Sequence, residues 1–458
     1  MPGSEDLVTH VHDQLVVVIG AGAAGLVAAW ECARVGLKVT VLDAAERLGG
    51  SLAPLEIDGM TVDGAHADFA PGDPAVGTVL SLLGCDDTEP VTEPRIALSA
   101  GGPAPLEGLL GIPTNPWAVD VRRVVGWSGT WRGYLDRIRP PMTIGREPSL
   151  GVLVRSRLGE RIADRLVAPL AAVRWETPLD DLDADAVLPG ISTALTRTGS
   201  LTAAAAQLGA GHAPARRAVR KGFGPFVTAL ETHLLDLGAE LRTSHAVTTI
   251  AHAEGRWRVS SEGDEIVADA VILAAGPAQT RRLFAHVLPD VEVVGPVDEV
   301  DVVTLVIDAP AQQRPQAMAF PRGSDVLSAA DVTAGTAGAE PDRRVIRVVL
   351  AAADRDDASV AATAMTSAAE LLGVPATAAR MRGFARSRRV TAGTGRRVGD
   401  AARVEAARDA LRAHAGLYAV GGWIAGGDLS EEIADAVRTA EGVRHTLLWG
   451  PQPGRGTP

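Results

Sequence analysis

The sequence is poor in several residue types on which particular classes of protein depend. Only 3% of its 458 residues are aromatic, and Lys38 and Lys221 are its only lysines. The two cysteines, Cys32 and Cys85, lie far apart, which in practice excludes a disulfide framework and favours a reduced, cytoplasmic setting. The net charge of −12 argues against nucleic acid as a partner, because phosphate binding needs a basic face.

Targeting and metal-binding signals are also missing. The stretch from Met1 to Asp13 carries acids instead of the basic region of a signal peptide. The longest apolar stretch, Leu15 to Trp30, is short and rich in glycine, so it does not predict a membrane-spanning helix, although peripheral contact with a membrane stays open. No other ligand cluster joins the pair His10 and His12, so we expect no metal site.

The start of the chain predicts a strand, a helix and a second strand. Leu15 to Ile19 is short, continuous and β-branched, which is typical of a buried parallel strand. Ala24 to Val35 predicts a helix that ends at Gly36, and Lys38 to Leu42 predicts the next strand. This order and length indicate a βαβ unit.

The turn between the first strand and the helix carries a dinucleotide-binding motif. Gly20 permits the tight turn, Gly22 lets a diphosphate approach the backbone, and Gly25 lets helix and strand pack closely. The helix N-terminus offers free N–H groups to the phosphates. Asp43, at the end of the second strand, is placed to accept hydrogen bonds from a ribose.

Further segments favour FAD over NAD. Arg47-Leu48-Gly49-Gly50 follows the acid directly, as in flavoproteins of the amine oxidase superfamily. Val247 ends a strand at the place where that superfamily holds the adenine, and glycine-rich turns recur near residues 276 and 421–429. The predicted cofactor-binding residues are Gly20, Gly22, Ala23, Ala24, Gly25, Asp43, Ala44, Arg47, Gly49, Gly50, Ser51, Val247, Ala275, Gly276, Gly421, Gly422, Asp428 and Leu429. Because 421–428 contains neither Cys nor His, we expect the FAD to be non-covalent.

The sequence offers no second dinucleotide site. Gly393 to Arg397 contains glycines, but no buried strand precedes them, so a basic loop is the better interpretation. Reduction is then expected to come from the substrate and reoxidation from oxygen, which favours an oxidase.

The predicted fold class is α/β, with a Rossmann-like FAD-binding domain, a mixed-sheet α+β substrate domain and a helical insertion. Helical spacing, for example over Leu150 to Val173, marks the insertion. An antiparallel meander is expected over Glu240 to Val247, Arg256 to Ser260 and Glu265 to Ala268. The expected boundaries are 14–100, 211–297 and 400–449 for the FAD-binding domain, 105–210 for the helical domain, 298–399 for the substrate domain, and 1–13 and 450–458 for flexible tails.

The chain resembles the oxygen-dependent coproporphyrinogen and protoporphyrinogen oxidases, especially the type of high-GC Gram-positive bacteria. Beyond the FAD motifs, the resemblance is carried by the segments Val62–Ala70, Gly108–Pro116, Ser149–Gly159, Asp164–Leu170, Ala194–Leu201 and Arg220–Phe223. It implies a helical domain over the mouth of the active site, a tetrapyrrole substrate and hydride transfer from a porphyrinogen meso carbon to flavin N5. It implies Arg174, Trp175, Arg197 and Phe69 as substrate-binding residues and identifies no catalytic base.

Several positions depart from the family pattern and leave alternatives open. Gly72 replaces a basic residue, Ala171 to Trp175 replaces a glycine-rich turn, and Asp428 replaces a glycine. One alternative is a flavin amine oxidase, for which Trp423 stands where an aromatic cage residue would, although the scarcity of lysine argues against it. The other is a degenerate FAD-binding paralogue with little activity. The arginines of the helical part are expected to form solvated helix faces: Arg122, Arg123, Arg132, Arg137 and Arg139.

Overall fold

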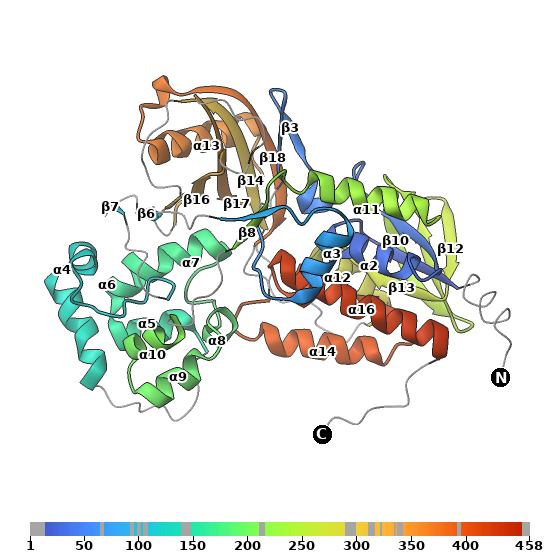
Figure 1. Ribbon diagram of the computed structural model, residues 1–458, viewed down its shortest axis with the longest axis horizontal. Coiled ribbons are helices and arrows are strands. Elements are labelled where there is room, and N and C mark those ends of the chain that lie inside the picture. Colours follow the sequence, from blue (N-terminus) through green and yellow to red (C-terminus); the bar gives the residue numbers. More distant parts are fainter. Residues whose placement is uncertain are drawn as a thin grey trace.

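The computed structural model shows three parts, and Figure 1 traces them from blue to red. The described residues are 14–64, 68–91, 96–98, 102–103, 109–138, 148–209, 216–288, 299–309, 317–320, 323–333, 336, 342–391 and 395–450. The predicted tails, apart from Gly450, and the His10 and His12 pair and Arg139 lie outside these ranges. No helix within the described part of the chain is both long and apolar enough to cross a membrane.

The first part is built on a five-stranded parallel sheet in the order β19-β13-β1-β2-β9. These strands are β19 (Leu417–Ala419), β13 (Ala270–Leu273), β1 (Leu15–Ile19), β2 (Lys38–Leu42) and β9 (Glu240–Arg242). Alternate residues of β1 enter opposite cores, Val16 and Val18 on one face and Val17 and Ile19 on the other.

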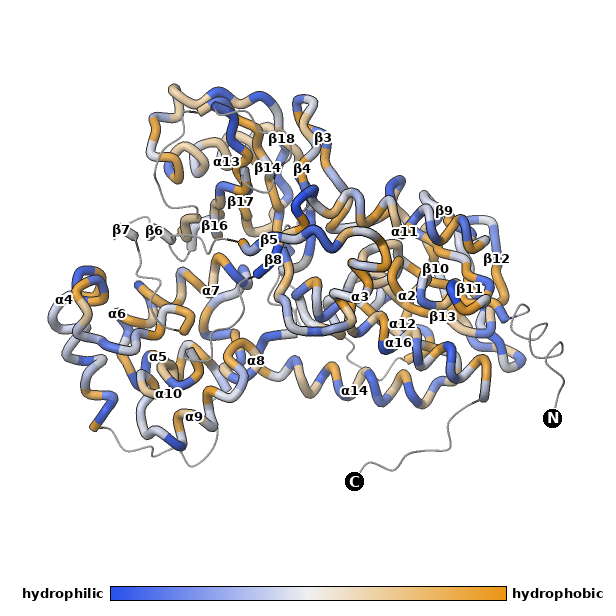
Figure 2. The backbone as a smooth tube through the Cα atoms, in the orientation of Figure 1, coloured by the Kyte–Doolittle hydropathy of each residue, from blue (hydrophilic) through white to orange (hydrophobic). Residues whose placement is uncertain are grey.

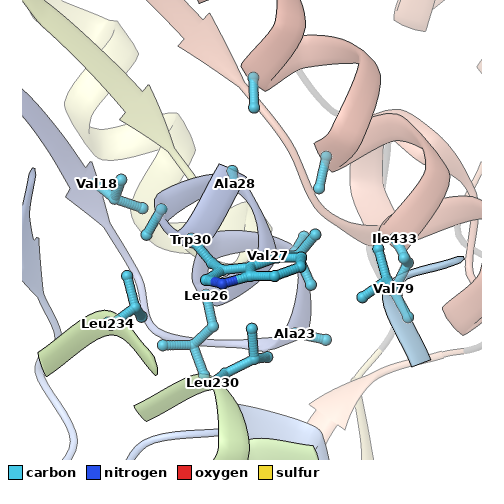
Figure 3. Packing of buried hydrophobic residues seen from close by; sticks show 14 of the residues in the cluster. Val18, Ala23, Leu26, Val27, Ala28, Trp30, Val79, Leu230, Leu234 and Ile433 are labelled. Carbon is cyan, nitrogen blue, oxygen red and sulfur yellow. The ribbon is translucent and has the colours of Figure 1, made fainter. Parts of the chain in front are cut away.

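Helices cover one face of this sheet. They are α2 (Ala23–Ala33), α3 (Pro74–Leu82), α11 (Gly224–Asp236) and α16 (Leu429–Trp449). All of α2 is buried, and Figure 3 shows Leu26 and Trp30 of α2 among Leu230, Leu234 and Ile433. A helix that is apolar all round is expected at such a central position, because neighbours surround it.

The opposite face carries an antiparallel meander and two helices. The meander is β10 (Val247–Ala253), β11 (Arg256–Ser261) and β12 (Asp264–Ala268), and the helices are α12 (Pro277–Val287) and α14 (Asp400–Arg412). Figure 2 shows hydrophobic and hydrophilic residues alternating along α14, as expected for a helix at the surface. The prediction that Glu240 begins the meander was wrong, because β9 pairs in parallel with β2.

The second part is helical. It comprises α4 (Val119–Tyr134), α5 (Leu150–Leu158), α6 (Glu160–Ile162), the π-helix η3 (Ala163–Val167), α7 (Ala168–Trp175), α8 (Ala184–Val187), α9 (Ile191–Thr198) and α10 (Leu201–Gly209). The helix expected over Leu150 to Val173 is interrupted at Gly159, which has a φ of +91°. Inside this part, buried Arg157 donates to the carboxylate of buried Asp136 at 2.6 Å.

The third part is a seven-stranded mixed sheet in the order β18-β14-β17-β16-β15-β6-β7. The strands are β18 (Arg380–Val390), β14 (Glu299–Asp308), β17 (Arg343–Ala351), β16 (Val326–Asp331), β15 (Ala317–Ala319), β6 (Ile96–Leu98) and β7 (Gly102–Pro103). Helix α13 (Asp357–Leu372) packs on one face, and the hairpin of β3 (Leu55–Ile57) and β4 (Met60–Val62) packs on the other. The expected boundary at residue 100 needs correction, because β6 pairs with β15 of this sheet and not with the FAD-binding part.

Candidate cofactor and substrate site

A cavity of about 460 Å³ opens at the carboxyl ends of β1 and β2. The predicted cofactor residues that line it are Gly20, Gly22, Ala23, Ala24, Asp43, Ala44, Gly50, Ser51, Val247, Ala275, Gly276, Gly421 and Gly422. They come from five separate stretches of chain, which the parallel sheet brings to one edge. A crevice at this edge is where open α/β sheets bind dinucleotides.

The three motif glycines play three different structural parts. Gly20 has a φ of +108°, and a Cβ there would lie 2.6 Å from the carbonyl oxygen of Ala274. A Cβ on Gly25 would overlap the carbonyl oxygen of Gly20, so Gly25 packs the helix against the turn. A Cβ on Gly22 would find nothing within 4 Å and would project into open space. The fold of the protein therefore requires glycine at positions 20 and 25. At Gly22 the fold tolerates a side chain, and glycine is required only if a ligand occupies the adjacent space.

Asp43 is held in a fixed position at the rim of the cavity. Its two carboxylate oxygens accept backbone N–H groups from Ala21 at 2.5 Å and from Ala45 at 2.7 Å. Since an ionised carboxylate has further acceptor sites, it retains capacity for ribose hydroxyls. The cavity therefore fits the adenosine half of FAD: an acid for the ribose and a free helix N-terminus for the diphosphate.

Five of the predicted cofactor residues do not line the cavity: Gly25, Arg47, Gly49, Asp428 and Leu429. Arg47 is exposed and donates to the carbonyl of Pro54 at 2.8 Å, so it fastens the following turn. Gly49 has a φ of +102° and donates its N–H to Ala21. Leu429 is buried in the core.

Asp428 caps the N-terminus of helix α16 and does not line the cavity. It accepts hydrogen bonds from the N–H and hydroxyl of Ser430 and from Arg216, the last at 2.6 Å. Burial acts to raise the pKa of Asp428, but Arg216 and Ser430 outweigh it and lower the pKa to about 2. The carboxylate is thus ionised and paired, so the charge of Asp428 is largely neutralised by Arg216.

Sequence reasoning missed several lining residues: His245, Gln279, Arg389, Thr391 and Glu432. Gln279 donates its amide to the carbonyl of Val247 at 2.6 Å, which fixes the turn expected beside the adenine. Arg389 stands at the end of β18 and reaches the cavity from the substrate sheet. No local motif marks these residues, because each arrives through a long-range contact.

Trp423 is not placed as an aromatic cage residue. Only 3% of it is exposed, and it packs edge-on against Phe284 at a ring distance of 6.2 Å. It is part of the core on the meander side of the sheet.

The predicted substrate residues fall into two groups. Arg174 and Trp175 end α7, and the next residue, Glu176, pairs with the cavity-lining Arg389. The Arg174 guanidinium lies 5.3 Å from the centre of the Trp175 ring. Phe69 is buried and packs against Phe223, so it belongs to the core. Arg197 is exposed on α9, which packs against α8 and α10, so the structure does not bring it to Arg174.

The Arg174 side chain keeps solvent-exposed surface at the end of α7 and is partly enclosed by the charged groups of Arg216, Asp428 and Asp68. Burial first, and then the nearby Arg216, lower the pKa of Arg174, while Asp428 and Asp68 oppose this shift. No carboxylate in the described part of the chain pairs with Arg174, because Glu176 pairs with Arg389 and Asp180 with Arg155. Its guanidinium is therefore open to an acidic ligand.

Charged contacts between the parts of the molecule involve further residues that sequence reasoning did not locate. Arg216 binds Asp68 and Asp428, each at 2.6 Å. Arg347 donates to the carbonyls of Asp63 and Gly64, and burial lowers its pKa to about 10. Within the ranges described, no group of three or more His, Cys, Asp or Glu residues could hold a metal ion.

Comparison with known proteins decides the family. The model of flavin-containing amine oxidoreductases matches residues 23–416. The chain belongs to this family. It is therefore an FAD-dependent oxidoreductase, and the predicted fold class and cofactor are confirmed.

Individual relatives agree with the resemblance noted from the sequence. The chain is 28% identical over 324 residues to coproporphyrinogen III oxidase of Propionibacterium freudenreichii subsp. freudenreichii, covering 61% of this chain and 60% of that one. It is 27% identical over 328 residues to coproporphyrinogen III oxidase of Mycobacterium tuberculosis H37Rv, covering 69% of each. A protein of Exiguobacterium sp. 255-15, for which protoporphyrinogen oxidation has been suggested, shares the fold with a TM-score of 0.79 at 21% identity, covering 94% of this chain and 98% of that one.

The first prediction is that FAD is held without a covalent bond. The stretch Gly421 to Asp428 contributes Gly421, Gly422, Trp423 and Gly427 to the cavity, and none of these has a side chain that usually carries a covalent flavin. Acid precipitation should leave the yellow cofactor in the supernatant. Flavin that stays with the precipitated protein would contradict this prediction.

Proposed function

We propose that the protein is an oxidase that dehydrogenates a porphyrinogen to the porphyrin in haem biosynthesis, with coproporphyrinogen III as the favoured substrate and oxygen as the acceptor. The observation that carries the proposal is the open Arg174 guanidinium at the end of α7, since this substrate bears carboxylate side chains. The names of the two bacterial relatives support the same substrate class. FAD supplies the hydride acceptor for such an oxidation.

The residues of this chain would bind and orient the substrate. Arg174 offers a planar fork of donors to a carboxylate, and the neighbouring Trp175 ring limits the positions that its guanidinium can take. The Glu176 to Arg389 pair, at 2.5 and 2.8 Å, ties the end of α7 to β18 at the wall of the cavity. Positioning of the substrate is the contribution that we assign to the protein.

Anaerobic mixing tests the function and its two alternatives together. Purified protein is mixed with coproporphyrinogen III, with a primary diamine, and with NADH or NADPH, while the flavin absorbance is followed. We expect rapid bleaching by the porphyrinogen alone, followed by recovery of the flavin and appearance of porphyrin when oxygen is admitted. Bleaching by the diamine would favour an amine oxidase, bleaching by a nicotinamide would exclude the proposed oxidase, and no bleaching would favour a degenerate FAD-binding protein.

The second prediction concerns Arg174. Arg174→Ala should raise KM for the porphyrinogen about ten- to hundred-fold, because one charged hydrogen-bonded contact contributes roughly 1.5–3 kcal/mol. FAD content should stay unchanged, since Arg174 does not line the cofactor cavity. Steady-state kinetics on the porphyrinogen would measure the change.

Arg197→Ala is the matched control. It removes an exposed arginine of the same helical part on α9, which packs against α8 and α10 and not against α7, so KM should not change. An unchanged KM in Arg174→Ala, or an equal rise in Arg197→Ala, would remove the assigned role.

A second proposal concerns the peripheral membrane contact that the sequence left open. Trp117, Trp127, Trp131 and Tyr134 form an aromatic patch on and before α4, with ring distances of 5.9 to 6.1 Å. Trp127 is 68% exposed and Trp131 56%, in a chain with only 3% aromatic residues. Figure 1 places α4 at the outer edge of the helical part.

Arginines surround this aromatic patch. The guanidinium of Arg122 lies 4.8 Å from the Trp127 ring centre, and that of Arg137 lies 5.8 Å from the Tyr134 ring centre. Trp and Tyr favour the interface between lipid and water, and Arg favours anionic headgroups. We therefore propose that the patch binds an anionic lipid surface.

The third prediction tests this contact by sedimentation. Replacing Trp127 and Trp131 together by Ser should abolish co-sedimentation with vesicles that contain phosphatidylglycerol. Trp449→Ser is the control, because Trp449 is 73% exposed at the far end of α16. A wild-type protein that stays in the supernatant, or a control that loses binding equally, would contradict the proposal.

A further inference from the structure

One acidic side chain stands in the wall of the cofactor cavity itself. Glu432 lies in the first turns of α16 and lines the same cavity as Gly22 and Asp43. Its carboxyl group lies against the backbone of Gly422, where an added Cβ would come within 2.8 Å of Oε1. The residue lies deep in the protein, yet it keeps partial exposure, because it faces the cavity.

No cation neutralises Glu432 in the described part of the chain. Its neighbours on the same helix are the acids Asp428 and Glu431, and these pair with Arg216 and Arg396 respectively, in each case at 2.6 Å.

The other elements around the cavity do not supply a counter-charge either. Helix α15 (Gly422–Ala425) has no titratable side chain. Arg389 lines the cavity from β18 but pairs with Glu176. Across the cavity stand Asp43, which is another acid, and His245.

This environment favours the neutral form of the carboxyl group. Burial first, and then the charges of Asp428 and Glu431, raise the pKa of Glu432 to about 8. FAD carries an anionic diphosphate, so a bound cofactor would disfavour ionisation further. A neutral carboxyl group, unlike a carboxylate, can donate a hydrogen bond to an oxygen of the cofactor.

We propose that Glu432 holds FAD as a protonated acid, donating its proton in a hydrogen bond to the cofactor, and that loss of this proton weakens FAD binding. The proposal rests on FAD as the occupant of the cavity and not on the identity of the oxidised substrate. The affinity for FAD should therefore fall as the pH becomes alkaline. Glu432 is in this sense a residue for cofactor retention.

Titration of the FAD-free protein with FAD, followed by quenching of flavin fluorescence, tests the proposal at several pH values. If only the protonated form binds well, the apparent Kd rises by up to about ten-fold per pH unit above the pKa of the free protein. We expect a rise of about ten-fold or more between roughly pH 7 and pH 9.5. A flat profile in the wild type would overturn the proposal.

Two variants separate Glu432 from other titrating groups. Glu432→Gln keeps a donor but cannot ionise, so its Kd should be nearly constant over the same range. Glu441→Gln changes an exposed acid of the same helix and should keep the wild-type profile. An equally steep rise in Glu432→Gln would assign the effect to another group and would overturn the proposal.

A measurement on the wild type keeps the test valid if Glu432→Gln does not fold. Calorimetric titration with FAD at about pH 8.5, in two buffers of different ionisation enthalpy, gives the number of protons taken up on binding. We expect a clear net uptake that disappears near pH 6. No uptake at the higher pH would contradict the proposal, whatever the outcome with porphyrinogen.

Discussion

Gly22→Val should give a folded protein that carries no FAD. Gly22 has φ −74° and ψ −178°, an extended conformation that any residue can adopt, so valine introduces no backbone strain. Its Cβ would meet no protein atom within 4 Å and would occupy the cavity where a diphosphate must approach the backbone. We expect flavin absorbance below about a tenth of the wild-type value, with the thermal midpoint of the FAD-free protein nearly unchanged.

Gly25→Ala is the contrasting variant. Its Cβ would overlap the carbonyl oxygen of Gly20 and press on the side chain of Ala274, so the helix must shift away from the sheet. Overpacking of this kind costs about 1–3 kcal/mol, and more where backbone atoms must move. Gly25→Ala should therefore lower the thermal midpoint, whereas Gly22→Val should lower only the FAD content. The interpretation of Gly22 fails if Gly22→Val keeps stoichiometric flavin or loses its helical circular dichroism.

These glycines show which features of the site could be predicted from the sequence. Gly20, Gly22 and Gly25 lie in one turn, and Asp43 follows one helix and one strand later, so local spacing was enough to place them together. Asp43 lies beside the glycine turn because β1 and β2 are adjacent and parallel, in register from Leu15 with Lys38 to Ile19 with Leu42.

Other parts of the site depend on contacts that local patterns do not record. Arg216 and Asp428 are 212 residues apart, yet their charged groups lie 2.6 Å from each other. Asp428 was expected near the cofactor, whereas Arg216, which neutralises it, carried no motif. Glu432 could not be distinguished from the acids of a solvated helix face until the cavity was located.

Errors in the fold have a similar origin. Glu240 to Arg242 has the short, alternating pattern of a meander strand, but only tertiary pairing shows that it completes the parallel sheet. Arg197 was placed at the cavity wall because its segment resembled the family. Its helix turns that side chain to the surface, since Ile191 and Ala194 occupy the buried face.

Breaking the buried ion pair between Glu176 and Arg389 should lower the free energy of unfolding more than any other substitution predicted above. The two side chains are 5% and 14% exposed, and they join at 2.5 Å across the contact between α7 and β18. Arg389→Met would leave the Glu176 carboxylate buried without this partner, which typically costs about 3–5 kcal/mol. The thermal midpoint of the FAD-free protein is the appropriate measurement, because Arg389 also lines the cofactor cavity.

A double variant separates the loss of the pair from the loss of an arginine. Combining Arg389→Met with Glu176→Gln removes both charges, so most of the lost stability should return, with a coupling energy of about 2 kcal/mol or more. Arg220→Met is the surface control: Arg220 pairs with Asp87 and Glu89 but is 54% exposed, so its loss should change the thermal midpoint little. If Arg389→Met lowers the thermal midpoint no more than Arg220→Met does, the pair does not fasten the helical part to the substrate sheet. The position of Arg174 at the end of α7 must then depend on other contacts.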